Sequence, residues 1–283
     1  MSDIAVIPGT THGIGRVIAS ELARAGLTVV MLCRDATAAG ALQVELQGAV
    51  PGAKVHVVRC DLASFASVRE AAGAVREQFG PLHLLINNAG MVSTKHRMSG
   101  DGFELTFATN HLGPFLLTSL LLDRMDPKIG RIVNTASRVH YKGRLDIESV
   151  RDPRAAYLGT TAYAQSKLAN VLHTLALARR LAGASVTVNC LHPGVVATNL
   201  LPRWLQAIKP LFSWVMFDAE RGARTTLHLA LASELQDVSG RYFDEHQLEQ
   251  PPSRLARDVE LQDRLWMQSA EWVGVPAAVA APK

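Results

Sequence analysis

Residues 3–15 read DIAVIPGTTHGIG, a short apolar run, Asp3–Pro8, followed by glycines at positions 9, 13 and 15. The run predicts a β-strand, and apolar residues at helical spacing from Ile14 to Ala25 predict a helix after the glycines, with Gly26 as its C-cap. A second apolar run, Leu27–Cys33, completes a strand, glycine turn, helix and strand. Such a turn lets main-chain N–H groups and the helix N-terminus approach a pyrophosphate closely, as in the first half of a dinucleotide-binding domain.

The same alternation continues along the chain. Short β-branched runs separated by helical segments predict a parallel sheet. We therefore expect an α/β fold with a single Rossmann-type, doubly wound parallel sheet of about seven strands and helices on both faces. No linker or repeat divides the sequence, so residues 1–273 are expected to form one domain and residues 274–283 a flexible tail. The predicted strands are Asp3–Pro8, Leu27–Cys33, Val55–Asp61, Leu82–Asn88, Arg131–Ser137, Val186–Leu191 and Gly240–Phe243.

The composition indicates a globular protein with a large core, because 48% of the 283 residues are hydrophobic and 19% are charged. There are 29 basic and 25 acidic residues, a net charge of +4, and the basic residues form no run of five or more. This distribution argues against a nucleic-acid partner. Mild basicity instead suits a small anionic ligand such as a phosphate-bearing cofactor.

The cysteine pattern indicates a reducing compartment. The chain has an odd number of cysteines and no Cys-x-x-Cys pair, and each cysteine ends an apolar run: Cys33, Cys60 and Cys190. We therefore expect buried free thiols and no metal site. The N-terminus enters a strand-like run without a charged leader, and no apolar stretch approaches the roughly 20 residues that a membrane span needs. We expect a soluble, uncleaved, cytoplasmic protein without a transmembrane span.

The apolar stretch Thr198–Phe217 follows the sixth predicted strand and contains two prolines. It is interpreted as a lid over an apolar substrate, as a packed core helix, or as a contact with a membrane surface or a second copy of the chain. The sequence thus leaves a peripheral membrane contact and a homo-oligomer open.

The end of the second strand bears on which dinucleotide binds. Arg34 stands nineteen residues after Gly15, where an acidic residue would bind the ribose 2′-hydroxyl of NAD and an arginine the 2′-phosphate of NADP. Asp35 is better placed to cap the helix that begins near Ala36. His12 either adds positive charge near this phosphate or is a solvent-exposed histidine. Arg34 therefore predicts NADP (NADPH) in preference to NAD.

Several polar residues are expected at the carboxyl edge of the sheet, where open α/β sheets bind ligands. The fourth strand ends in Asn87-Asn88-Ala89-Gly90 and the fifth in Ser137. Tyr163 and Lys167 lie four residues apart in a helical stretch and so share one face. A tyrosine with a pKa of about 10 is a weak base at neutral pH, and a nearby ammonium lowers that pKa. The pair therefore predicts a general acid or base.

Taken in chain order, these motifs resemble the short-chain dehydrogenase/reductase family over about residues 3–272. The motifs are Gly9-x-x-x-Gly13-x-Gly15, Asn87-Asn88-Ala89-Gly90, Ser137, Tyr163-x-x-x-Lys167 and Pro193-Gly194. Further segments resemble the branch of retinol dehydrogenases and WW-domain oxidoreductases: Asn110–Phe115, Arg131–Ser137, His192-Pro193-Gly194 and Gly240–Phe243. Light-dependent protochlorophyllide reductases are also similar to this branch, so the resemblance implies no particular substrate.

The resemblance implies a role for each residue of a catalytic group. Tyr163 would donate a proton in reduction and accept one in oxidation, and Ser137 would bind the substrate oxygen. Lys167 would hold the nicotinamide ribose and lower the pKa of Tyr163. Asn110 would anchor a water that joins Lys167 to a proton relay. The hydride would move between the substrate carbon and the nicotinamide, while the protein supplies orientation and electrostatics.

The resemblance also implies a set of cofactor contacts, to which Tyr163 and Lys167 contribute. The remaining contacts are Gly9, Thr11, His12, Gly13 and Ile14 around the phosphates, Arg34 at the 2′-phosphate, Asp61 and Leu62 at the adenine, Asn87 and Gly90 along the ribose, and Val196 and Thr198 at the carboxamide end. The chain departs from the family at Pro8, where most members have threonine or serine. Proline removes that hydroxyl and a main-chain N–H.

The resulting hypothesis is an NADP(H)-dependent oxidoreductase that interconverts an alcohol and a carbonyl on a hydrophobic small molecule. One alternative is a cofactor-bound enzyme that uses Tyr163 for a non-redox reaction such as cyclisation or epimerisation. The other is a non-catalytic sensor of NADP(H), which would have no need of Tyr163 or Lys167.

Overall fold

The computed structural model describes residues 3–152, 156–194, 219–279 and 282. Within these ranges eight strands form one sheet, in the order β3-β2-β1-β4-β5-β6-β7-β8. The pairs from β3 through β7 are parallel, so their carboxyl ends meet at one edge of the sheet. The strands are β1 Ile4–Pro8, β2 Thr28–Cys33, β3 Val55–Arg59, β4 Leu84–Asn87, β5 Arg131–Thr135, β6 Thr187–Leu191, β7 Tyr242–Phe243 and β8 Glu249–Gln250.

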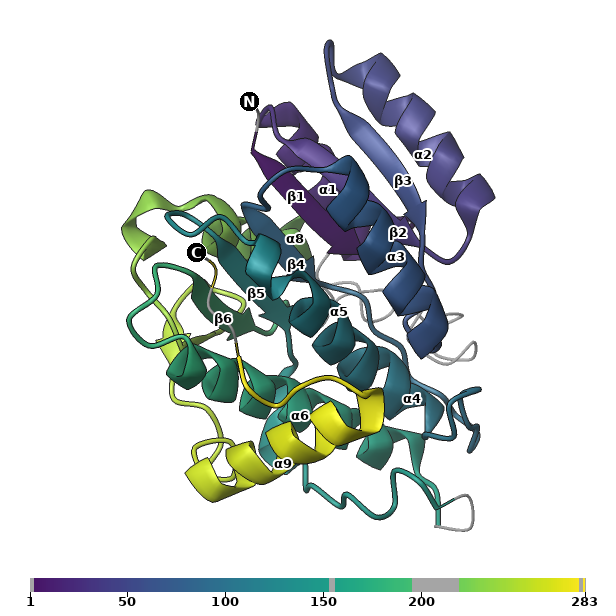
Figure 1. Cartoon of the computed structure of the whole chain (residues 1–283), viewed down its shortest axis with the longest axis vertical. Helices are drawn as coiled ribbons and strands as arrows, with labels where there is room; N and C mark the ends of the chain where they lie inside the picture. Colours follow the sequence, from purple (N-terminus) through teal and green to yellow (C-terminus); the bar gives the residue numbers. More distant parts are fainter. Residues whose placement is uncertain (1–2, 153–155, 195–218, 280–281, 283) are drawn as a thin grey trace, which may run out of the picture.

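Helices cover both faces of the sheet, as the sequence predicts (Figure 1). One face packs against α1, α2 and α8, and the other against α3, α5 and α6, with α9 packed outside α5 and α6. The α-helices are α1 Gly13–Arg24, α2 Ala36–Ala49, α3 Phe65–Gln78, α4 Leu105–Phe107, α5 Gly113–Leu121, α6 Gly159–Arg180, α8 Ala219–Leu231 and α9 Val259–Val273. Shorter helical segments are the π-helix η1 Ala108–Leu112 and the 3₁₀ helices η2 Leu122–Arg124, η3 Arg138–Lys142 and η5 Ser233–Leu235.

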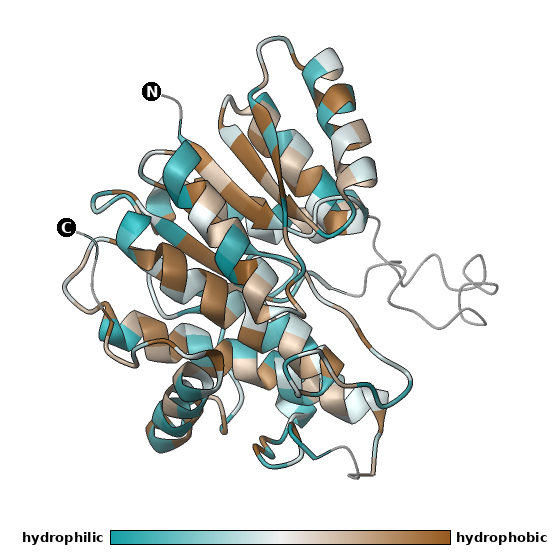
Figure 2. Ribbon diagram, turned by 45° about the vertical axis from the view of Figure 1, so that its right-hand side comes forward, coloured by the Kyte–Doolittle hydropathy of each residue, from teal (hydrophilic) through white to brown (hydrophobic). Residues whose placement is uncertain are grey.

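The sheet is buried between these helix layers, and its central strands are apolar along their length (Figure 2). All six residues of β2 are buried. Neighbouring side chains point to opposite faces, so Val30 belongs to the α3 side of the core and Met31 to the α1 side. Strands buried on both faces appear in a sequence as continuous apolar runs, which is why the runs are informative here.

The seven predicted strands are all present, but each is shorter than predicted by one or two residues at an end, and β4 is shorter at both ends. The eighth strand, β8, was not predicted and pairs antiparallel with β7. It has only two residues, Glu249 and Gln250, which are polar, and Glu249 is exposed, so it carries no apolar signal. The sheet is thus parallel except at this edge.

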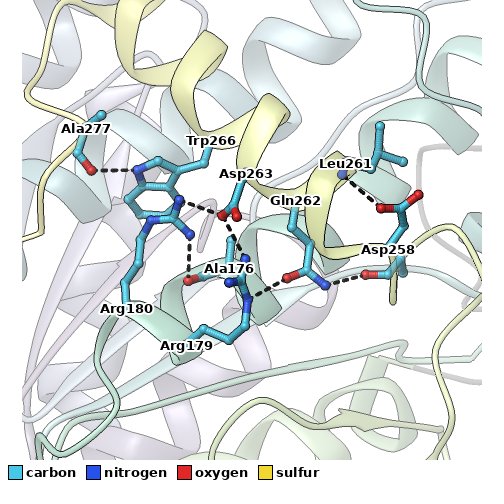
Figure 3. A network of polar contacts seen from close by, with 10 residues as sticks. Ala176, Arg179, Arg180, Asp258, Leu261, Gln262, Asp263, Trp266 and Ala277 are labelled. Atoms are coloured by element: carbon cyan, nitrogen blue, oxygen red, sulfur yellow. Dashed lines mark hydrogen bonds and ion pairs between the residues drawn. The ribbon is translucent and has the colours of Figure 1, made fainter.

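A polar network fastens α9 to α6 (Figure 3). The Arg179 Nε donates to Gln262 Oε1 at 3.0 Å, and the guanidinium groups of Arg179 and Arg180 each contact Asp263 Oδ1 at 2.8 Å. The Arg180 guanidinium also lies 4.5 Å from the ring centre of Trp266. These contacts place α9 over the outer side of α6.

The segment after α9, expected to be a flexible tail, makes specific contacts with the core. Val275, Ala277 and Val279 pack against the α3 side of the core. The Trp266 indole N–H donates to the Ala277 carbonyl at 2.8 Å. Residues 274–279 are therefore held by α9 in a way that the short, small-residue sequence does not predict.

One apolar helical run is longer than expected. Residues Leu105–Arg124, which include α4, η1, α5 and η2, form a run of 20 residues that is long and apolar enough, by length and composition alone, to cross a membrane. The expectation that no stretch approaches this length was therefore wrong. In the fold most of its apolar part is buried, as is typical of a core helix. The three cysteines are buried free thiols, as predicted.

Candidate active site

The glycine turn after β1 is compact because two of its glycines touch neighbouring backbone. A Cβ on Gly9, whose φ is +79°, would lie 2.8 Å from the Ala89 Cβ. A Cβ on Gly15 would lie 2.1 Å from the Gly9 carbonyl oxygen and 2.6 Å from the Asn88 Nδ2. The Asn88 amide in turn donates to the Gly9 carbonyl at 3.3 Å. Glycine is thus required at both positions by the close packing of the turn against the residues after β4 and the start of α1.

The N-terminus of α1 has main-chain donors available for a ligand. His12 is its N-cap residue, but the His12 side chain makes no capping hydrogen bond, and the first turn contains no acidic residue. Instead, the His12 Nδ1 lies 2.8 Å from the hydroxyl of Thr11; His12 is exposed and Thr11 is half-buried. The first N–H groups of a helix have no partner within it, so an uncapped N-terminus suits an anion.

Arg34 and Asp35 follow β2 and have separate roles in the structure. The Asp35 carboxylate accepts from the Ala38 N–H at 3.0 Å and caps α2, which confirms the predicted capping role. Arg34 is exposed and forms no ion pair with any described residue. Its charge is therefore available at the carboxyl edge of the sheet.

Asn87 ends β4, Asn88 follows it, and their side chains have different partners. The Asn87 amide donates to Thr118 Oγ1 at 2.9 Å and to Asn134 Oδ1 at 2.8 Å, and its side chain is buried. Its Oδ1 is buried and has no hydrogen-bond partner among the described residues. Asn88, which was not among the predicted contacts, is the asparagine that bonds the glycine turn.

Asp61 and Leu62 follow β3, one strand beyond β2. The Asp61 carboxylate accepts from the Ala63 N–H at 3.0 Å, and its own N–H donates to the Ser67 hydroxyl at 3.0 Å. A Cβ on Gly113 would lie 2.3 Å from the Leu62 carbonyl, so the start of α5 presses on this segment. The pair is held rigidly at the outer end of the same sheet edge as the glycine turn.

Asn110 lies in the π-helix η1 and is fully buried. Its Oδ1 accepts from the Met91 N–H at 2.7 Å, and its Nδ2 donates to the Met91 carbonyl at 2.9 Å and to the Ser166 hydroxyl at 3.0 Å. Both side-chain N–H donors are thus committed, which leaves the main chain of Asn110 for any bound water. π-Helical turns inside helices often occur at functional sites.

Tyr163 and Ser137 meet at the end of β5. Ser137 is the N-cap residue of η3 and accepts from the Val139 N–H at 3.4 Å. Burial raises the pKa of the Tyr163 hydroxyl, and a hydrogen bond with the Ser137 side chain lowers it in part. The net direction is upward, so the predicted lowering of this pKa was wrong for this structure. The reason is desolvation of the phenol, which the Tyr-x-x-x-Lys spacing does not reveal.

Lys167 lies one helical turn beyond Tyr163 and is only 2% exposed. Its Nζ donates to the Thr135 carbonyl at 2.8 Å and lies 5.6 Å from the centre of the Tyr163 ring. Burial lowers the pKa of Lys167 to about 8. An ammonium has three N–H donors, and Thr135 is the one acceptor among the described residues. Donors therefore remain for a ligand beside Tyr163.

The space above Lys167 is kept open by Gly90. A Cβ at Gly90 would lie 3.3 Å from the Lys167 Nζ and 3.6 Å from the Asn110 Oδ1. The predicted catalytic residues Asn110, Ser137, Tyr163 and Lys167 thus converge on one part of the carboxyl edge. The predicted contacts Val196 and Thr198, and the stretch 198–217, lie outside the described residues.

Two side chains that support this group were not predicted. The Asn170 amide donates to the Thr135 carbonyl at 3.2 Å, the same oxygen that Lys167 uses. The Ser166 hydroxyl donates to the Tyr163 carbonyl at 2.8 Å and accepts from Asn110. Ser166 and Asn170 lie three and seven residues after Tyr163 on α6, and this helical spacing was the available signal.

The arrangement fits a dinucleotide. The N–H groups at the start of α1 have no side-chain cap, and the glycine turn before them packs too closely for side chains. The Lys167 ammonium has N–H donors left for the hydroxyl groups of a ligand. The fold and this site together define the class: a nucleotide-binding α/β enzyme with a tyrosine, serine and lysine group for acid or base chemistry.

Comparisons with known proteins agree with this class. The short chain dehydrogenase family matches residues 3–209. Human retinol dehydrogenase 13 is 40% identical over 281 residues, covering 96% of this chain and 85% of that protein. Mouse retinol dehydrogenase 12 is 38% identical over 275 residues, covering 96% and 86%.

Solved structures are similar over most of the chain as well. An uncharacterized protein from Mycobacterium Paratuberculosis has a TM-score of 0.80 at 34% identity, covering 96% of this chain and 94% of that one. A blue fluorescent protein from a metagenomic library, solved in complex with NADPH, has a TM-score of 0.70 at 28% identity, covering 86% and 95%.

The chain belongs to the short-chain dehydrogenase family, and its relatives place it on the retinol dehydrogenase branch. It is therefore an oxidoreductase of a family that uses a nicotinamide cofactor to interconvert alcohols and carbonyls. The relatives also include a chloroplastic short-chain dehydrogenase, TIC 32 A of Brassica napus, at 38% identity over 276 residues, covering 93% of this chain and 86% of that protein.

Proposed function

We propose that the chain is an NADP(H)-dependent oxidoreductase that interconverts an alcohol and a carbonyl on a hydrophobic small molecule. The observation that carries the proposal is the convergence of Ser137, Tyr163 and Lys167 beside a glycine turn with uncommitted N–H groups. A bound nicotinamide cofactor would supply the hydride. Everything else in the reaction is positioning and proton transfer by the chain's own residues.

Tyr163 acts as the general acid in reduction. Because burial raises the pKa of its hydroxyl, Tyr163 holds its proton at neutral pH and donates it to the substrate oxygen. Ser137, which hydrogen-bonds the same hydroxyl, donates to that oxygen and orients it. Lys167 places a positive charge near the phenolate that remains, and a charge of opposite sign favours the ionised form. Asn110 holds Met91 against α6 and so shapes the space around this group.

The cofactor would lie along the carboxyl edge from β3 to β6. The residues that would hold it are Gly9, Thr11, His12, Gly13 and Ile14 at the phosphates, Asp61 and Leu62 at the adenine, Asn87 and Gly90 at the ribose, Tyr163 and Lys167 at the nicotinamide ribose, and Val196 and Thr198 beyond it. Support for NADP over NAD comes from Arg34, an exposed arginine without an ion pair among the described residues, next to an aspartate that is already used as a helix cap.

Support for a hydrophobic substrate comes from the relatives and from composition. The relatives are named retinol dehydrogenases, and retinol is an apolar alcohol. The stretch 198–217 is rich in tryptophan, leucine and phenylalanine. The three buried thiols suit a reducing compartment, and we place the protein in the cytoplasm on that ground.

Cofactor titration tests the proposal first. Nicotinamide fluorescence and thermal shift should show tight binding of NADPH and weak binding of NADH, because a ligand that binds only the folded state raises apparent stability. A panel of aldehydes, ketones, retinoids and steroids is then screened for NADPH oxidation. Binding of neither cofactor would contradict the proposal and point to the effect of Pro8 on the turn.

A Tyr163→Phe variant separates catalysis from sensing. Loss of the general acid should lower the turnover rate by about 10²–10⁴-fold, while NADPH affinity should fall far less, because the glycine turn and Lys167 remain to hold the cofactor. Tyr141→Phe is the matched control, because the Tyr141 side chain is half exposed and its hydroxyl donates to the Pro251 carbonyl. Full cellular effect of the Tyr163→Phe variant would instead favour the sensor.

A further inference from the structure

A buried histidine follows β6 at the start of the Pro193-Gly194 turn. His192 is 5% exposed, and both ring nitrogens have partners. Its Nδ1 accepts from the Gly194 N–H at 3.1 Å, and its Nε2 lies 2.6 Å from Glu245 Oε2. The imidazole therefore bridges the turn after β6 and the segment after β7.

These two contacts define the protonation state of the ring. Because Nδ1 accepts a hydrogen bond, it carries the lone pair, and the proton lies on Nε2, which donates to the Glu245 carboxylate. Burial lowers the pKa of His192, while the charge of Glu245 opposes that effect. His192 is thus a neutral ring in one tautomer with a donor and an acceptor that both have partners.

Glu245 is presented to His192 by the tight turn between β7 and β8. The Asp244 Oδ1 accepts from the N–H groups of His246 and Leu248 at 2.8 and 3.0 Å, and its Oδ2 accepts from the Gln250 side chain at 2.8 Å. A carboxylate that binds the main-chain N–H groups of its own turn restricts that turn. The β8 strand, which the sequence did not predict, therefore helps to hold the Glu245 carboxylate in place.

The position of Gly194 on the sheet relates this bridge to the cofactor. Strand β6 lies three strands from β1 in the order β1-β4-β5-β6, which is about 14 Å at about 4.8 Å per strand. Arg34 follows β2, on the opposite side of β1 from this turn. Ser137 follows β5, and β5 pairs with β6. The Gly194 turn is thus next to the reacting group and far from the adenosine end.

We propose that His192 and Glu245 are positioning residues that hold the Gly194 main chain in place, so that this turn supports the nicotinamide end of the cofactor. The inference rests on the proposed use of NADP(H). Neither residue contacts the reacting atoms, and neither belongs to the predicted set of site residues. A purely structural role would weaken the binding of all ligands or of none, whereas a positioning role weakens only ligands that carry the nicotinamide half.

Two probes separate these roles, namely NADPH and adenosine 2′,5′-bisphosphate, which lacks the nicotinamide half. His192→Ala should raise the Kd for NADPH by about tenfold, the effect of one lost hydrogen bond, and leave the Kd for the bisphosphate within about twofold. His192→Asn should recover most of the NADPH affinity, because an asparagine carbonyl accepts from the N–H two residues on. Unchanged bisphosphate binding also shows that the variants are folded.

Glu245→Ala should weaken NADPH binding in the same selective way, and combining it with His192→Ala should add little, because the two residues act as one unit. His246→Ala is the matched control. Its ring is 65% exposed and only approaches Glu245 Oε1, at 4.0 Å, so NADPH affinity should not change. Additive losses in the double variant, or equal losses for both probes, would overturn the positioning role.

A measurement without cofactor completes the test. Nitrogen-15 NMR of the wild type should show His192 as the Nε2–H tautomer, and amide hydrogen exchange at Gly194 should be faster in His192→Ala and restored in His192→Asn. If His192→Ala binds both NADPH and the bisphosphate as tightly as the wild type does, this inference alone is overturned. A wild type that binds no nicotinamide cofactor overturns the proposed function and, with it, the role assigned here to the turn.

Discussion

Replacement of Gly15 by alanine should destabilise the protein even though alanine is the better helix former. Gly15 lies in the first turn of α1 and does not have a positive φ, so conformational strain is not the issue. The obstacle is space, since the new Cβ would lie 2.1 Å from the Gly9 carbonyl oxygen and 2.6 Å from the Asn88 amide nitrogen. The carbonyl is main chain in a tight turn and has no rotamer to which it could move.

The magnitude follows from two opposing effects. Helix propensity favours alanine by about 1 kcal/mol. Overpacking costs up to about 3 kcal/mol, and the short distance to a main-chain oxygen places this site at the upper end. We therefore expect a net loss of about 2 kcal/mol, together with displacement of the Gly9 main chain and a weaker affinity for NADPH. Gly40, in the interior of α2, has nothing within 4 Å of its Cβ position, so Gly40→Ala should stabilise by up to about 1 kcal/mol.

Urea denaturation of the two variants beside the wild type measures the effect, with NADPH fluorescence as the second readout. The two substitutions are chemically identical and both lie in helices, so opposite signs isolate the contact with Gly9. If Gly15→Ala were as stable as Gly40→Ala and bound NADPH like the wild type, the close approach of α1 to the turn would be refuted.

Further predictions concern the cofactor, a buried charge and the anchoring of α9. Arg34→Asp should shift the preference from NADPH toward NADH, because a carboxylate repels a 2′-phosphate and accepts from a 2′-hydroxyl; an unchanged ratio of kcat/KM values would contradict the role of Arg34. The pKa of Lys167 is about 8 in the folded chain and 10.5 ordinarily, so the unfolded chain binds more protons between these values and stability rises with pH. Relative to Lys167→Met, the wild type should gain about 3 kcal/mol of unfolding free energy from pH 8 to 10.5, and a constant difference in urea titrations would refute this. Trp266→Ala should lower the free energy of unfolding by about 3–5 kcal/mol, and Asp263→Asn by less than about 1 kcal/mol, since its ion pairs are exposed. If denaturant titrations gave similar losses for the two variants, the ion pairs would contribute as much as Trp266 to holding α9.

Much of the fold was predictable because the central strands are buried on both faces. A strand such as β2, with six buried residues, appears in the sequence as a continuous apolar run. The same signal fails at β8, whose two polar residues gain their strand geometry only from pairing with β7. It also fails for residues 274–279, where the contacts depend on Trp266 presenting its indole N–H to Ala277.

The candidate active site likewise has features that the sequence predicts and features that it does not. The spacing of Tyr163 and Lys167 predicts that they share a helix face, and the position of Asp35 before Ala36 predicts the cap that the structure has. The direction of the Tyr163 pKa was not predictable, because it depends on how many groups exclude water from the phenol. Asn88 is a similar case, since its contact with Gly9 joins residues 79 positions apart.

The elements, their order and the identity of the chemistry-bearing residues follow from the sequence, because apolar period, glycine placement and helical spacing are local properties. The state of those residues depends on tertiary contacts: the raised pKa of Tyr163, the uncommitted donors of Lys167, and the bridge from His192 to Glu245. Desolvation and hydrogen bonding between distant segments produce these features. Both depend on which surfaces the fold brings together, and no local pattern in the chain records that.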